Sequence, residues 1–247
     1  MLQSILNATL NLLLGIILLA FLPAVFNQFI GNVADFFHHF AWHSIAFGTG
    51  MGLVIERFLN RFIPEIEILE HEITHALVGI PFGFIPTGIS VSRRRGGECR
   101  HYAVIPWPLI PLYPVAKRIV TLAPYFMPIF TVIMASFRPI TPSNWQPWYD
   151  LGIGATFGYH SLGTLAELRE NFTSSNLADG SGRWKKSDIG KTGIIFAPIF
   201  IIVATLAVHG LILAVIVHDY SGMAQWGRET WYFTKTTTMP YIFSLVK

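Results

Sequence analysis

Long apolar runs are the feature that most restricts the folds open to this chain. Residues 193–217 (GIIFAPIFIIVATLAVHGLILAVIV) contain no charged residue, and residues 4–26 are almost as apolar. Each run exceeds the roughly 20 residues that a helix needs to cross the hydrocarbon core of a bilayer. No Lys or Arg precedes Arg57, so we expect 4–26 to be a retained span rather than a cleaved signal peptide. Of all residues, 52% are hydrophobic and only 13% are charged, about half the charge of a soluble domain. The sequence therefore predicts an integral, multi-pass membrane protein.

Shorter apolar segments set the number of spans. Residues 119–137 and 149–166 each fit one further span, and residues 41–56, which are glycine-rich and less apolar, predict a second span or a re-entrant segment. Residues 218–247 form a polar tail whose apolar runs are too short to cross again. No internal repeat or separate soluble domain is visible. We therefore expect an all-α polytopic membrane protein with about 4–6 transmembrane helices, built as a single membrane-embedded domain over residues 1–247.

Basic residues gather in two loops. One group lies between residues 93 and 118 and the other between 169 and 191, whereas the connection at 139–148 has no basic residue. Cytoplasmic loops of membrane proteins carry an excess of Lys and Arg, so we expect both basic loops in the cytoplasm, with 119–166 as a hairpin between them. The basic residues behind the net charge of +3 therefore indicate how the chain is oriented in the membrane. It gives no reason to expect a nucleic-acid partner.

A metal-binding motif lies among these apolar segments. It is the pentapeptide His-Glu-Ile-Thr-His, from His71 to His75, in a helix expected to cover residues 65–80 and to end at Pro81. Histidines four apart lie on the same face of a helix, one turn from each other, as two zinc ligands must. Glu72 can reach a metal-bound water without binding the metal. The pattern predicts His71 and His75 as metal ligands and Glu72 as the catalytic residue.

A catalytic zinc site of this type needs a third protein ligand and an open position for water. Cys99 is the only cysteine, which excludes a thiolate cluster and leaves nitrogen and oxygen ligands. We favour Asp188, in SDIGKTG just before the last apolar run, over Asp179 in NLADG and over His160 within the segment 149–166. Asp150 is the least favoured, because it falls on the side opposite to the basic loops.

The segment that follows the motif helix predicts a β-hairpin over residues 88–105. GISVS and CRHYAVI flank a charged turn that contains Gly-Gly, and their alternating pattern is typical of paired strands. A hairpin in this place can pair with an extended substrate as an added strand.

Taken together, LEHEITHAL (69–77), the glycine and hairpin after it, and SDIGKTGIIFAPIF (187–200) resemble the site-2 protease family of intramembrane zinc metalloproteases. The likeness is closer to the compact bacterial-type members, and the rest of the chain matches only in hydropathy. In the better-known branch an Asn-Pro stretch leads to Leu-Asp-Gly, which Ala178-Asp179-Gly180 matches only in part.

The resemblance implies hydrolysis of peptide bonds within or beside the membrane. His71, His75 and a carboxylate, with Asp188 favoured, would hold Zn²⁺, and Glu72 would act as general base. The implied partners are a membrane-protein or peptide substrate and the lipid bilayer, with the active site toward the cytoplasmic side.

Two other functions stay open at this stage. One is a noncatalytic zinc-binding membrane scaffold of the same fold, and the other is a metal or proton transporter. An intact Glu72 favours the enzyme over the scaffold, since zinc binding alone does not require it. A transporter is expected to show repeated halves, and none is visible.

Overall fold

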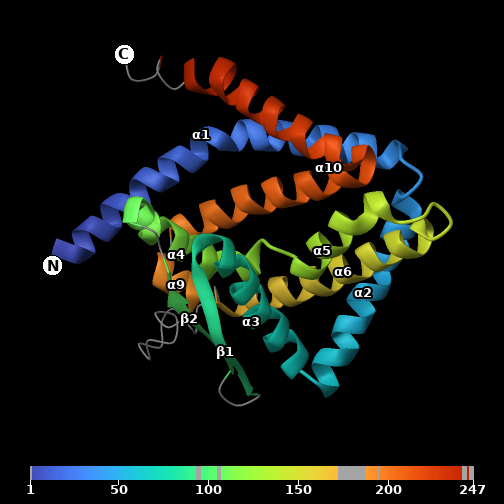
Figure 1. Ribbon diagram of the computed structural model, residues 1–247, viewed down its shortest axis with the longest axis horizontal. Helices are drawn as coiled ribbons and strands as arrows, with labels where there is room; N and C mark the ends of the chain where they lie inside the picture. The colour runs from blue at the N-terminus through green and yellow to red at the C-terminus, as the bar shows by residue number, and fades with distance from the viewer. Residues whose placement is uncertain are drawn as a thin grey trace.

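The chain folds into helices and one small hairpin (Figure 1). The computed structural model describes residues 2–92, 96–104, 107–171, 187–193, 195–240 and 244. Within these residues the α-helices are α1 (Leu2–His38), α2 (Trp42–Phe62), α3 (Glu65–Gly79), α4 (Tyr113–Leu122), α5 (Ile129–Phe137), α6 (Gln146–Asn171), α9 (Asp188–Thr192) and α10 (Phe196–Phe233). The strands β1 (Phe84–Ser92) and β2 (Gly96–Ala103) pair antiparallel. The mostly helical fold and the hairpin after the motif helix are therefore confirmed.

Two of the described helices are long and apolar enough to cross a membrane. They are Asn7–His38 and Phe196–Thr238, whose most apolar windows have mean hydropathies of 2.4 and 2.8. A bent pair, Ile110–Tyr125 with Ile129–Ile140, raises the number to three if its two parts form one span. The expected total of four to six spans stays a prediction.

The segment expected as one span over residues 119–137 is not a continuous helix. α4 ends at Leu122 and α5 begins at Ile129, with a short 3₁₀ turn between them, and the two halves are bent by 88°. Pro124 and Pro128 both fall in this gap. Proline lacks the N–H that a helix needs and clashes with the preceding turn, so the chain must change direction here.

α2 and α6 pack so closely that their backbones touch. A Cβ atom on Gly48 or Gly52 of α2 would meet backbone atoms of α6, and one on Gly154 or Gly158 of α6 would meet the backbone of α2. In each helix the two glycines are four residues apart, which places them on one face, as in many closely packed membrane helices. The less apolar segment at 41–56 is thus part of a full helix, paired with α6.

α10 turns back on itself at Asp219. This is the only non-glycine residue with positive φ (55°) among the residues described. Gly210 lies against Trp226, and Gly222 lies against the backbone of Ala214, so the parts before and after the turn pack antiparallel (Figure 1). The first part corresponds to the predicted apolar run, and most of the predicted polar tail is helical and lies along α1.

A buried ion pair holds the end of the first part of α10. Arg138 donates from Nε and Nη2 to the carboxylate of Asp150, at 2.6 and 3.2 Å, and from Nη1 to the carbonyl of Ile216 at 2.8 Å. Asp150 is fully buried and Arg138 is 3% exposed. Removing one partner of such a pair leaves an uncompensated buried charge, which costs about 3–5 kcal/mol. Asp150 therefore has a structural role as the partner of Arg138.

The contact between α2 and α6 predicts unequal effects of two neighbouring glycine substitutions. Gly52→Ala forces a methyl group into the backbone of Ala155 and should lower the free energy of unfolding by about 1–3 kcal/mol. Gly50→Ala is the matched control, because a Cβ there meets nothing within 4 Å. Thermal unfolding in detergent measures both variants, and equal midpoints would contradict the packing described.

Candidate metal centre

α3 carries both histidines of the motif on one face. The helix begins after Pro64 with Glu65 and Glu67 in its first turn, where acidic groups are favoured by the helix dipole. It passes at Ile80 into a 3₁₀ turn that contains Pro81. The predicted motif helix over 65–80 is therefore confirmed to within one residue.

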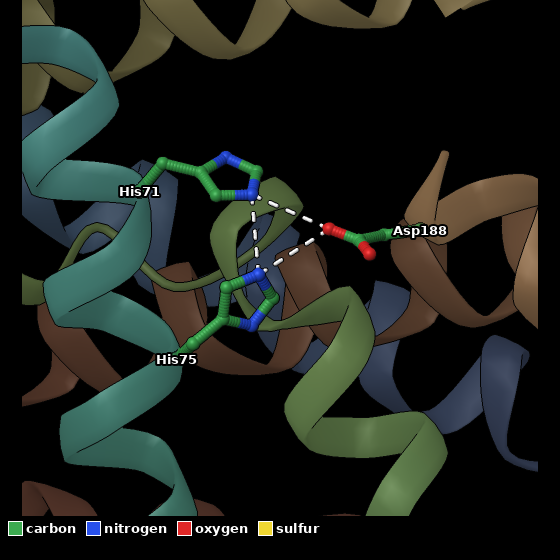
Figure 2. A group of neighbouring side chains, drawn as sticks. All are labelled: His71, His75 and Asp188. Atoms are coloured by element: carbon green, nitrogen blue, oxygen red, sulfur yellow. Dashed lines mark hydrogen bonds and ion pairs between the residues drawn. The ribbon is translucent and has the colours of Figure 1, made fainter. Parts of the chain in front are cut away.

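His71, His75 and Asp188 point at one another (Figure 2). The two Nε2 atoms are 3.1 Å apart, and Oδ2 of Asp188 lies 3.4 Å from Nε2 of His71 and 3.3 Å from Nε2 of His75. In a regular tetrahedron with metal–ligand bonds of about 2.1 Å, the ligand atoms are about 3.4 Å apart. The three side chains therefore form a group that can hold a metal ion.

The outer nitrogen of each histidine ring is bound by the protein. Nδ1 of His75 lies 2.8 Å from the carbonyl oxygen of Val120, and Nδ1 of His71 lies 3.0 Å from Oε2 of Glu167. A carbonyl oxygen only accepts hydrogen bonds, so Nδ1 of His75 carries the proton and Nε2 of the neutral ring offers a lone pair. The Glu167 carboxylate favours the same tautomer of His71. Such partners orient metal-binding histidines, and their loss typically lowers metal affinity by about 10–100-fold.

These contacts explain why the centre fits a cation. Two ring nitrogens and one carboxylate oxygen converge on one position, where a cation could bind all three. Two imidazoles and one carboxylate are the donors that a catalytic zinc ion uses. The donor set and its spacing both fit the predicted ion.

Asp188 is held in place by its own short helix. Ser187 caps α9 by accepting a hydrogen bond from the N–H of Gly190 at 3.1 Å. Lys191 donates to the second carboxylate oxygen, Oδ1, at 2.8 Å. Oδ1 is therefore bound by the ammonium group, while Oδ2 faces the histidines.

Glu72 lies beside the centre and against the hairpin. Its side chain is 6% exposed and contacts Gly97 of β2, where a Cβ atom would collide with its carboxylate. The backbone N–H of Cys99 lies near enough to this carboxylate to favour its charged form. Burial, and then the charge of Glu72, raise the pKa of the Cys99 thiol to about 11. Cys99 is not in the group whose donor atoms converge, which consists of His71, His75 and Asp188.

The centre opens into a cavity of about 900 Å³. Its walls come from α2, α3, β1, β2, α4, α6 and α9, and they include His101 and Ala103 of β2 and Lys117 of α4. The volume is large enough to admit a stretch of polypeptide beside Glu72.

The other candidates for the third ligand are placed elsewhere or lie outside the described residues. His160 is buried and binds Oε1 of Glu70 through Nδ1 at 2.9 Å, so it is a partner of Glu70 and not a ligand of this group. Asp150 pairs with Arg138. Asp179 lies outside the described residues.

Two residues that support the centre were not found from the sequence. Glu167 on α6 orients His71 and accepts a hydrogen bond from the hydroxyl of Tyr125 at 2.7 Å. Glu167 has one signal in the sequence, because a carboxylate in an apolar protein is costly unless it is bound or functional. Whether Glu167 orients His71 or His75 depends on how α6 packs against α3.

Comparisons with protein-family models, with curated proteins and with solved structures each find no match to this chain.

The centre predicts which single changes remove the metal. After removal of metal with a chelator and reloading with Zn²⁺, Asp188→Ala and His71→Ala should lose stoichiometric zinc, because each removes one of three ligands. Cys99→Ala and Asp179→Ala should keep it. Elemental analysis of the purified proteins measures this, and an Asp179 variant that loses zinc while Asp188→Ala retains it would reverse the assignment.

Proposed function

We propose that this protein is an intramembrane zinc endopeptidase, which hydrolyses peptide bonds in or near the transmembrane segments of membrane-protein substrates. The observation that carries the proposal is the position of Glu72: a buried carboxylate that is not a ligand lies beside three converging metal ligands, at the wall of a large cavity. A centre that only stores or binds metal has no use for such a group.

The chain's own residues would divide the chemistry as follows. Zn²⁺ held by His71, His75 and Asp188 would lower the pKa of a coordinated water to about 7 and polarise a carbonyl group. Glu72 takes the proton of the attacking water as general base and passes it to the amine nitrogen that leaves. The close approach of Gly97 leaves room for the Glu72 carboxylate beside β2, near the N–H of Cys99.

Hydropathy and charge support a location at the membrane. Asp188 precedes Phe196, the first residue of a helix apolar enough to span, so the centre lies close to one end of that span. The excess of Lys and Arg on both sides of the centre in sequence favours the cytoplasmic side. We propose a multi-pass protein with its active site at that depth.

The hairpin is the proposed binding strand for the substrate. A helical substrate must unwind before its peptide bonds can be attacked, and an unwound segment leaves backbone groups that need partners. β2 lines the cavity from Gly97 to Ala103. Pairing with β2 would satisfy those groups and hold the substrate extended beside Glu72.

The proposal predicts that Glu72→Ala and Glu72→Gln separate binding from catalysis. Both variants should keep stoichiometric zinc, because Glu72 is not a ligand, and should lose at least about 100-fold in the rate of cleavage. The assay is cleavage of purified single-span reporter proteins in detergent or bilayers. A wild type that holds zinc and cleaves none of them would favour the noncatalytic scaffold.

The hairpin is tested by proline substitutions on its two strands. Ala103→Pro removes a donor from the strand that lines the cavity and should lower kcat/KM, mainly through KM, with zinc content unchanged. Val91→Pro is the comparison, since Val91 lies on β1 and does not line the cavity. Cleavage untouched in Ala103→Pro would remove the hairpin from the mechanism.

A further inference from the structure

Asn11 on α1 makes an unusual contact with the helix that carries the third ligand. Its Nδ2 donates to the carbonyl of Thr192, the last residue of α9, at 2.9 Å across 181 positions of sequence. Its Oδ1 accepts a hydrogen bond from Nε of Arg118 on α4 at 2.7 Å. Both ends of the Asn11 amide are thus bound, and its orientation is fixed.

The contact matters because α9 has only five residues. So short a helix has little stability of its own, and its position depends on what holds its ends. The first end has the Ser187 cap, and the last end has Asn11. The Thr192 hydroxyl also donates to the carbonyl of Asp188 at 2.9 Å, which links the two ends of the helix directly.

The backbone after α9 is shaped to admit Asn11. Gly193 has φ 109°, which L side chains rarely adopt, and a Cβ atom there would lie 2.9 Å from Nδ2 of Asn11. Only glycine permits both this turn and the close approach of the amide.

Arg118 extends the same network to the other side of the centre. It donates from Nη1 to the carbonyl of Pro114 at 2.7 Å and so is fastened to its own helix, α4. α4 also carries Val120, whose carbonyl binds Nδ1 of His75. One guanidinium group therefore ties the helix that orients His75, through Asn11, to the helix that carries Asp188.

We propose that Asn11 and Arg118 are positioning residues of the metal centre, which set the distance between the Asp188 carboxylate and the two histidines. The inference rests on the metal centre of the proposed function, but not on peptide hydrolysis. It gives the first helix of the chain a role in metal affinity although α1 supplies no ligand.

A second asparagine on α1 provides a matched control. Nδ2 of Asn32 donates to the carbonyl of Gly210 at 2.8 Å, which is the same kind of bond between α1 and a later segment. Gly210 lies in α10 and contacts no ligand of the centre. Asn11→Ala and Asn32→Ala each remove a bond from an α1 amide to a backbone carbonyl, and only the carbonyl of Thr192 leads to Asp188. Asn11→Ala also removes the bond from Arg118.

The experiment measures metal affinity and stability on the full-length protein in detergent. The metal-free protein is titrated with Co²⁺, read by its visible absorption, and with Zn²⁺ against a chelator of known affinity. Asn11→Ala should weaken both affinities by about tenfold or more, whereas Asn32→Ala should lower the thermal midpoint but leave both affinities unchanged. Asn11→Asp, which can still accept from Arg118 but cannot donate to Thr192, should behave as Asn11→Ala does.

The outcomes separate this inference from the proposed function. Wild-type affinity in both Asn11 variants, or equal loss in the Asn11 and Asn32 variants, would overturn it. A wild-type protein that binds no metal would overturn it together with the proposed function. Selective loss in the Asn11 variants would support it even where no reporter protein is cleaved.

Discussion

Backbone carbonyl groups at helix ends and breaks are the constraint around which this structure is arranged. A carbonyl that leaves the hydrogen-bond ladder of a helix needs another donor, and in an apolar chain water is a poor source of one. Polar side chains provide it at three such places. Arg138 binds the carbonyl of Ile216 before the turn of α10, Asn11 binds that of Thr192, and His75 binds that of Val120.

The last of these contacts joins the fold to the chemistry. Pro124 and Pro128 end α4 and turn the chain before α5. Pro124 has no N–H to give to the carbonyl of Val120, four residues before it, so this carbonyl accepts from the N–H of Ala123 and keeps a second lone pair for a side chain. The side-chain donor it receives is the ring N–H of His75, a member of the candidate metal centre. A break that looks like a defect in a membrane helix thus fixes the tautomer of His75 and directs its other nitrogen toward the metal position.

Whether the sequence predicts a feature depends on how far apart along the chain the interacting residues lie. The i, i+4 spacing of His71 and His75 and the alternating pattern of the hairpin are local, and both the helix and the hairpin form. The predicted Gly-Gly turn is wrong in detail, because Gly96 and Gly97 lie in β2, paired with Ser92 and Val91, and β1 begins at Phe84 and not at residue 88. Asp188 was favoured for its place before an apolar run, and the fold brings it to the histidines. The roles of Glu167 and Asn11 depend on the packing of distant helices, which no short pattern encodes. The prolines in the sequence do indicate the break between α4 and α5. An average of hydropathy over residues 119–137 does not register them.

The ligands come from distant parts of the chain, and this has a thermodynamic consequence. His75 and Asp188 are 113 positions apart, so an unfolded chain does not bring them together, and an ion binds all three groups only in the native state. Each tenfold rise of free metal above its dissociation constant then adds about 1.4 kcal/mol to the free energy of unfolding. A bound ion would act as a reversible cross-link between the first and last thirds of the chain. The concentration of free metal would then set the stability of the fold as well as the occupancy of the centre.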